Sequence, residues 1–179
     1  MKSHSYVVSI AAGVSQLPLL KAAKDLGYRT IAIDRDIQAP GLDYADVVIT
    51  QSTLETKSII AELDLLSGTF ELAGVVARTT GDALYTAVAI TERFGLNGLT
   101  SELVRIATEK SALHRFCDLN GLPMASWNWV GSTHDLPQYV EVPIIVKPDG
   151  TVKGKANVRL CREKANLNQY VVEAVTMSA

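Results

Sequence analysis

The stretch VPIIVKPDGTVKGKANVR, residues 142–159, decides how the second half of the chain folds. Its first residues are apolar and rich in β-branched side chains, which predicts a short buried strand that ends at Lys147. Pro148 has no N–H and ends the strand, and Asp149-Gly150 is typical of a turn in which glycine takes a positive φ. A second strand is expected from about residue 157 to 160, so the stretch predicts a β-hairpin.

The loop of this hairpin suits phosphate oxygens. Exposed backbone N–H groups and mobile cations lie together there, beside Lys147, and both attract anions. Taken alone, the loop also fits an ordinary hairpin whose lysines keep its tip in solvent. The candidate phosphate ligands are Gly150, Thr151, Lys153, Gly154 and Lys155.

Composition limits the classes of function. Seventeen basic and nineteen acidic residues give a formal net charge of −2, which leaves no electrostatic footprint for nucleic acid. No apolar stretch approaches the roughly 20 residues of a membrane helix, and the first residues lack a signal-peptide pattern. Cys117 and Cys161 lie far apart without nearby histidine pairs, which favours a cytoplasmic protein without a zinc site. We expect Cys117 to be a small buried hydrophobe.

Strand and helix signals alternate through the first hundred residues. Gly27 and Gly95 end two of the expected helices, and Ser52 or Thr53 is available to cap another. Buried, non-alternating strands in repeated strand–helix–strand units predict a parallel sheet with helices on both faces. We therefore expect an α/β, Rossmann-like domain at residues 1–98. The expected strands are at 6–11, 30–33, 46–50 and 72–77, and the expected helices at 17–26, 54–66 and 83–94.

The turn after the first strand raises the question of a dinucleotide. Asp34 closes the second strand where such a fold would hold a ribose. The turn itself, AAGVSQLP at 11–18, has one glycine where the pyrophosphate fingerprint needs three, which argues against NAD. Gly13 and the following helix start can still form an anion or carboxylate site, or a tight turn and nothing more.

The fourth strand ends in a polar segment at the edge of the sheet where ligands of open α/β folds collect. Arg78 can bind a carboxylate or pair with an acid that closes the domain. Asp82 can cap the next helix, which we favour, or receive a substrate amine. The charges at 34–36 are expected to pair with each other in solvent.

A run of small residues at 97–101 marks a domain boundary, so residues 99–179 are expected to form part of a second, α+β domain. Ser101 begins a helical segment, and a second helix opens at 108–110. Lys110 lies near its start, where the macrodipole disfavours a cation, and a bound phosphate would explain that placement. This helix is expected to have one apolar face, formed by Leu113, Phe116, Cys117 and Leu119. A strand at 124–130 and a helix at 165–175 complete the expectations.

In this order the parts resemble the front half of an ATP-grasp enzyme of the carboxylate–amine ligase type, the group of carbamoyl-phosphate synthase large chains and biotin carboxylase. The stretch at 11–49 resembles the preATP-grasp domain of these ligases. The segments GDALYTAVAITERFGLNGLT at 81–100 and ATEKSALHRFCDLNGLP at 107–123 are similar to the linker and the first lysine-bearing helix. PIIVKPDGTVKGKANVRL at 143–160 resembles the strand, second lysine and glycine-rich lid.

The resemblance implies roles for particular residues. Lys110 and Lys147 match the two lysines that contact the nucleotide phosphates, and 150–156 matches the lid over them. Lys153 and Ala156 stand where the family often has glycine, so the backbone is less free to approach phosphate. The family's magnesium ligands and catalytic arginine have no counterpart among these residues, so we expect the chain to be a fragment that is inactive alone.

The resemblance implies that the intact protein uses ATP and Mg²⁺ to activate a small-molecule carboxylate as an acyl phosphate, which an amine then attacks. Gly13, Arg78 and Asp82 are the candidates for contact with those substrates. No nucleic acid or membrane partner is expected, and an incomplete second domain invites self-association. A non-catalytic binding or regulatory module that kept the preATP-grasp fold is the alternative.

Overall fold

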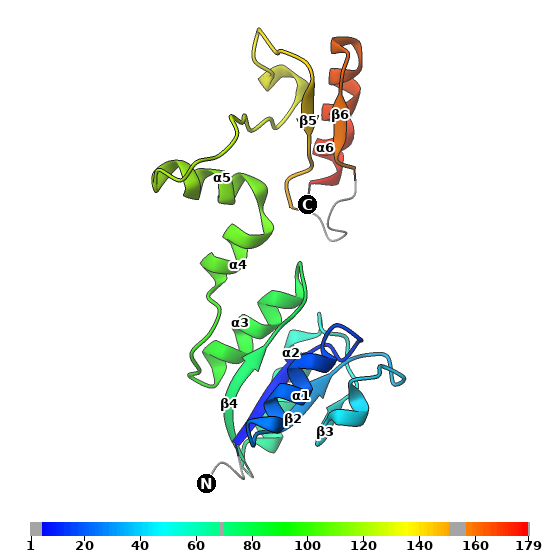
Figure 1. Cartoon of the computed structure of the whole chain (residues 1–179), viewed down its shortest axis with the longest axis vertical. Coiled ribbons are helices and arrows are strands. Elements are labelled where there is room, and N and C mark those ends of the chain that lie inside the picture. The colour runs from blue at the N-terminus through cyan, green and yellow to red at the C-terminus, as the bar shows by residue number, and fades with distance from the viewer. Residues whose placement is uncertain (1–4, 69, 151–156, 179) are drawn as a thin grey trace. The chain divides into compact units, whose positions relative to one another are not determined.

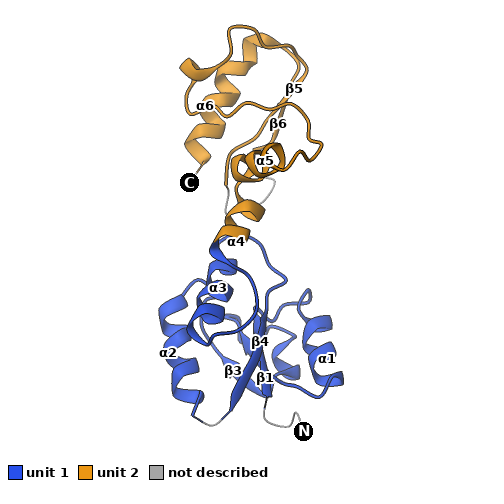
Figure 2. Ribbon diagram, turned by 90° about the vertical axis from the view of Figure 1, so that its left-hand side faces the viewer, with its two compact units in different colours: residues 1–101 blue, residues 102–179 orange. Residues whose placement is uncertain are grey.

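The computed structural model describes residues 5–68, 70–150 and 157–178 of the chain. These residues form two compact units, 1–101 and 102–179, which are distinguished by colour in Figure 2. Within the described residues, none of the helices is both long enough and apolar enough to span a bilayer.

The first unit is built on a four-stranded sheet with the order β3-β2-β1-β4. All three strand pairs are parallel, and β1 lies between β2 and β4. The predicted α/β class and parallel, Rossmann-like sheet are confirmed. The strands are β1 (Ser5–Ile10), β2 (Arg29–Ile33), β3 (Val47–Ile49) and β4 (Glu71–Val76), as Figure 1 shows.

Helices cover both faces of this sheet (Figure 2). Val8, Ile10 and Ile33 are fully buried in a large core that includes residues of α2 and α3. Ala32, between Ile31 and Ile33 along β2, belongs instead to a smaller cluster with Leu20 of α1. Successive residues of a strand point to opposite faces, so burial on both sides explains the continuous apolar runs in the sequence. The helices are α1 (Leu17–Asp25), η1 (Leu42–Tyr44), α2 (Thr56–Leu66) and α3 (Ala83–Arg93).

The helix ends follow the glycines at two places and depart from expectation at a third. Gly27 and Gly95 have φ values of +82° and +62°, which end α1 and α3 as predicted. The expected cap of α2 is wrong, because Glu55 holds the N-cap position rather than Ser52 or Thr53. The carbonyl of Thr53 accepts a hydrogen bond from the Thr86 hydroxyl of α3, which holds this segment as a loop before the helix.

The second unit contains the predicted hairpin. β5 and β6 are antiparallel, with Ile145 opposite Leu160. The second strand begins at Arg159, later than expected, because Asn157 has a left-handed φ of +56° that a strand does not accommodate. The core beneath the hairpin contains Cys161, Leu167 and Val171. The elements are α4 (Ser101–Thr108), α5 (Lys110–Leu119), η2 (Thr133–Asp135), β5 (Ile144–Val146), β6 (Arg159–Cys161), η3 (Lys164–Asn166) and α6 (Leu167–Met177).

Two expectations for this unit are wrong. Residues 124–130 form no strand, and the segment is held to α5 by side chains. The Trp127 ring stacks on His114 at 4.9 Å between centroids, and its Nε1 donates to Asp118 at 2.8 Å. The second wrong expectation is the apolar face of α5. The buried residues of this helix are Ala112 and Cys117, whereas the Leu119 side chain is 88% exposed. Cys117 is the buried hydrophobe that was predicted.

Candidate functional site

Lys147 follows directly after β5, on the face of the hairpin that points away from α6. Ile144 and Val146 pack against the core that includes Leu167 of α6, so the alternation of the strand places Ile145 and Lys147 on the opposite face. We call this the outward face. Ile145 is 57% exposed and its cross-strand partner Leu160 is 48% exposed.

The outward face therefore pairs a flat apolar surface with a cation. Val158, just before β6, is 40% exposed as well. Within the described part of the chain, Lys147 has no acidic partner. An exposed apolar patch beside an unpaired cation is suited to a ligand with an aromatic ring at one end and negative charge at the other.

The turn that follows Lys147 has the predicted form. Pro148 is buried, and Gly150 has a φ of +61°, which glycine adopts at no steric cost. Thr151, Lys153, Gly154, Lys155 and Ala156 lie outside the described residues, so their predicted contact with phosphate stays a prediction.

Asp149 connects this turn to the start of α5. Its Oδ1 accepts a hydrogen bond from the Ser111 backbone N–H at 3.0 Å. Burial alone raises the pKa of the Asp149 carboxyl, but hydrogen bonds from Ser111 and the Lys110 backbone, with the Lys110 charge, outweigh it and lower the pKa from 3.8. The carboxyl is therefore ionised at neutral pH.

Lys110 is the first residue of α5, where the helix dipole disfavours a cation. The negative charge that lies near it is the Asp149 carboxylate. The structure thus brings Lys110 together with the turn after Lys147, although the two lysines are far apart in the sequence. The second unit contains both predicted phosphate-binding lysines.

The candidates of the first unit meet at the carboxyl edge of the sheet. Arg78 Nη1 donates to the Ser15 carbonyl at 3.0 Å, and Gln16 Nε2 donates to the Arg78 carbonyl at 2.6 Å. Arg78 is thereby joined to the turn that contains Gly13. Among the described residues Arg78 has no acidic partner, and its guanidinium has further N–H donors beyond the one on Ser15.

The charges at 34–36 do not pair with each other as expected. Asp34 accepts the Ala12 backbone N–H at 2.8 Å and the Asp36 N–H at 3.0 Å. These bonds hold the turn after β1, where Ala11 has a left-handed φ of +70°. Both oxygens of Asp34 serve the protein's own backbone.

The favoured role of Asp82 as a helix cap holds for its position but not for its side chain. Asp82 holds the N-cap position of α3, but its side chain makes no capping hydrogen bond. Its φ of −63° and ψ of −24° are helical, whereas a capping side chain reaches back from an extended residue. Its alternative role toward a substrate amine stays a prediction.

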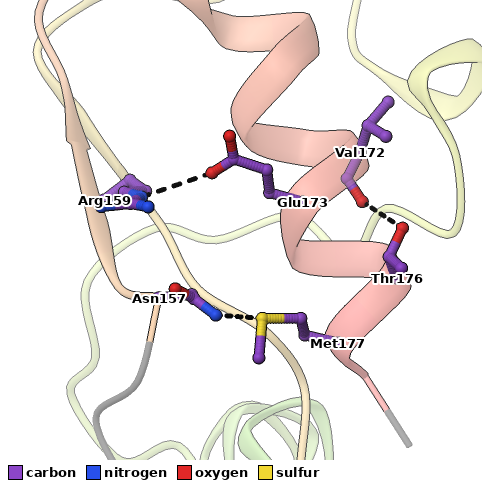
Figure 3. A pocket seen from close by; sticks show the side chains of 6 residues that line it. All are labelled: Asn157, Arg159, Val172, Glu173, Thr176 and Met177. Atoms are coloured by element: carbon purple, nitrogen blue, oxygen red, sulfur yellow. Dashed lines mark hydrogen bonds and ion pairs between the residues drawn. The ribbon is translucent and has the colours of Figure 1, made fainter.

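A small pocket lies between β6 and α6 (Figure 3). Arg159 and Glu173 pair across it at 3.4 Å, and the Asn157 amide bonds to the Met177 sulfur. Thr176 donates to a backbone carbonyl of its own helix. Since every polar side chain of the lining already has a partner, this pocket presents little to recognise a ligand. Its lining residues are Asn157, Arg159, Val172, Glu173, Thr176 and Met177.

Two features of the candidate site were not predicted from the sequence. The outward face of Ile145 and Leu160 could have been found from strand alternation, because Ile145 and Lys147 are two residues apart. The bond from Asp149 to α5 had no local signal, because its partner lies 38 residues away.

Comparisons with known proteins show what the chain resembles. No family model matches the sequence, and no curated protein matches it. N5-carboxyaminoimidazole ribonucleotide synthetase, in a complex with ADP, is similar at 19% identity with a TM-score of 0.77, over 98% of this chain and 45% of that one. L-amino acid ligase from Bacillus licheniformis is similar at 17% identity with a TM-score of 0.73, over 97% and 42%.

A third similar structure is phosphoribosylglycinamide synthetase from Anaerococcus prevotii, at 19% identity and a TM-score of 0.65, over 97% of this chain and 41% of that one. The chain shares its fold with part of each of these synthetase and ligase structures. The chain spans less than half the length of these three structures, so what it shares with them is part of their fold.

Proposed function

We propose that these residues form the ATP-binding part of a ligase that activates a carboxylate as an acyl phosphate for attack by an amine. One observation carries the proposal. The outward face of the hairpin presents Lys147 beside exposed Ile145 and Leu160, and the next turn is hydrogen-bonded to the start of α5, which holds Lys110. The ADP complex of a structure with this fold supports a nucleotide as the ligand.

Each group has a chemical role in this proposal. The apolar pair Ile145 and Leu160 gives a purine base a flat surface on which to pack. Lys147 and Lys110 supply the positive charge that balances the phosphates, as the resemblance to the ligases implies. The resemblance implies that the segment 150–156 also contacts the phosphates, which stays a prediction because residues 151–156 lie outside the described residues.

Magnesium is the metal expected in such a reaction, where it neutralises charge on the transferring phosphoryl group. The described residues bring together no group of three or more His, Cys, Asp or Glu that could hold it. No metal ligand is therefore assigned among the described residues. As the resemblance implies, we expect these 179 residues to bind nucleotide without completing the ligase reaction alone.

The carboxylate substrate is assigned to the first unit. Arg78 offers a guanidinium at the edge of the sheet, next to the turn of Gly13, and Asp82 follows on the same loop. A guanidinium recognises a carboxylate through paired N–H donors. Both cysteines are free and buried, and we place the reaction in a reducing cytoplasm.

Calorimetry with Mg-ATP on the full-length protein tests the proposal. Lys147→Ala removes one charge-assisted contact and is expected to weaken binding by ~10-fold or more. Lys164→Ala is the matched control, because Lys164 belongs to the same unit but packs over the Tyr139 ring at 4.7 Å. Unchanged affinity after Lys147→Ala would overturn the assignment.

A further inference from the structure

Asp149 lies in the turn that follows Lys147, and two hydrogen bonds hold it there. Its carboxylate accepts the Ser111 N–H at 3.0 Å, and its own N–H donates to Ser178 Oγ at 2.9 Å. Ser178 Oγ in turn donates to the Ala174 carbonyl, near the end of α6, at 2.9 Å. One residue therefore joins the start of α5, the turn and the end of α6.

The start of α5 depends on the bond between Asp149 and Ser111, because the helix has no capping side chain of its own. Glu109 holds the N-cap position of α5, and its side chain makes no capping hydrogen bond. The first N–H groups of a helix have no partner within the helix, and a carboxylate is the group that best satisfies them. Asp149 does so from 38 residues away.

This bond lies between the two lysines. Lys110 immediately precedes Ser111, and Lys147 precedes Asp149 by two residues. The intervening Pro148 is buried and has a φ that its ring fixes, so little freedom remains between Lys147 and the bond. The hydrogen bond between Asp149 and Ser111 therefore also fixes the spacing between the backbones of Lys110 and Lys147.

We propose that Asp149 is a positioning residue, which sets the spacing of Lys110 and Lys147 so that both ammonium groups reach the phosphates of one nucleotide. The inference rests on the proposed ATP binding and goes beyond it, because Asp149 itself need not touch the ligand. Its carboxylate is directed at the helix start, where it satisfies backbone donors.

The first experiment tests the bond without any nucleotide. Amide hydrogen exchange of Ser111 is measured in the 179-residue chain and in its Asp149→Asn and Asp149→Ala variants. Loss of the cap is expected to accelerate exchange at Ser111 by ~10-fold, more in the alanine variant. Asp118→Asn is the matched control, because Asp118 lies on the same helix and bonds to the Trp127 ring. Unchanged exchange at Ser111 in both Asp149 variants would overturn the proposal.

The second experiment asks whether Asp149 acts through the lysine. Mg-ATP affinity is measured by calorimetry for the full-length protein, Asp149→Ala, Lys147→Ala and the double variant. We expect Asp149→Ala to weaken binding by ~10-fold alone and by less than ~3-fold when Lys147 is already alanine, since a positioning residue has little to do without the group that it positions.

The outcomes separate the two proposals. Equal losses in both backgrounds would mean that Asp149 supports folding in general, and would overturn the positioning role. No loss after Asp149→Ala, in a protein that binds Mg-ATP, would overturn it as well. Absence of Mg-ATP binding by the unaltered protein would overturn the proposed function itself, and the positioning role with it.

Discussion

The two units hold their candidate residues in opposite ways. At the sheet edge of the first unit, Asp34, Gln16 and Arg78 bond to the backbones of neighbouring loops, and helices cover both faces of the sheet. In the second unit, the described residues pack a core against one face of the hairpin, and Lys147 follows exposed Ile145 on the other. The first unit uses its polar groups to shape loops, whereas the second exposes a cation and an apolar surface, which we propose bind a nucleotide.

The largest expected difference between the units lies in their apolar residues. Ile33→Ala deletes a fully buried side chain of the first unit and is expected to lower the free energy of unfolding by ~3–4 kcal/mol. Ile145→Ala on the outward face should cost less than ~0.5 kcal/mol, because its side chain is already 57% exposed. Urea unfolding followed by circular dichroism measures both. Equal losses of unfolding free energy would contradict the contrast between a sheet that is packed on both faces and a hairpin whose outward face is exposed.

Gly41 tests how tightly the loops of the first unit pack. A Cβ at this position would lie 2.5 Å from the Ala12 carbonyl oxygen, which already accepts the Gly41 N–H. Gly41→Ala is therefore expected to cost ~2 kcal/mol, measured by the same urea titration. Gly68→Ala is the control, because a Cβ there meets nothing within 4 Å, and it should change stability by less than ~0.5 kcal/mol. A tolerated Gly41→Ala would show that the loop can move aside.

We expect Asp149 to make the stability of the second unit sensitive to acid. Its pKa in the folded protein lies below 3.8, so its contribution is complete above that pH and is lost as the pH falls through the lower, folded value. Asp149→Asn should lose ~1 kcal/mol at neutral pH, as for other helix caps, and show a weaker acid dependence. Tryptophan fluorescence measures this, since both tryptophans, Trp127 and Trp129, belong to the second unit. Identical acid profiles for the two proteins would contradict it.

The smallest expected effect concerns two residues with left-handed backbones. Ala11 has a φ of +70°, which costs ~1–2 kcal/mol for an L residue. Glycine removes this cost, but it loses more backbone entropy on folding, which offsets part of the gain in stability. Ala11→Gly should therefore raise the stability of the first unit by ~0.5 kcal/mol. Asn157→Gly in the second unit should bring no gain, because asparagine tolerates its φ of +56° and its amide bonds to the Met177 sulfur. Thermal unfolding of both variants gives the comparison, and a destabilised Ala11→Gly would argue against strain at this turn.

Most of the fold could be predicted from the sequence because the signals are local. The apolar strands, the glycine that ends α1 and the turn at Gly150 each depend on residues within a few positions of one another. The expected strand at 124–130 failed because a strand needs a neighbour to pair with. The side chain of Trp127 bonds to α5 instead.

The candidate site was only partly predictable. Lys147 and the turn after it follow from the hairpin pattern, and Lys110 was indicated by its place near a helix start and by the resemblance to ATP-grasp ligases. The capping role expected for Asp82 failed because its backbone is already helical, which no sequence pattern at that position reveals. The outward face required knowing which side of the hairpin α6 covers.

The sequence by itself determined the parallel α/β sheet, the hairpin and the end of the strand that carries Lys147. Periodicity and turn chemistry act over short stretches of chain, so they can be read from the residues alone. Only the tertiary structure decided that Asp149 caps α5 from 38 residues away and that Arg78 joins Ser15 from 63 residues away. Such bonds form when long-range packing brings distant backbone donors and acceptors together, and that depends on the whole fold.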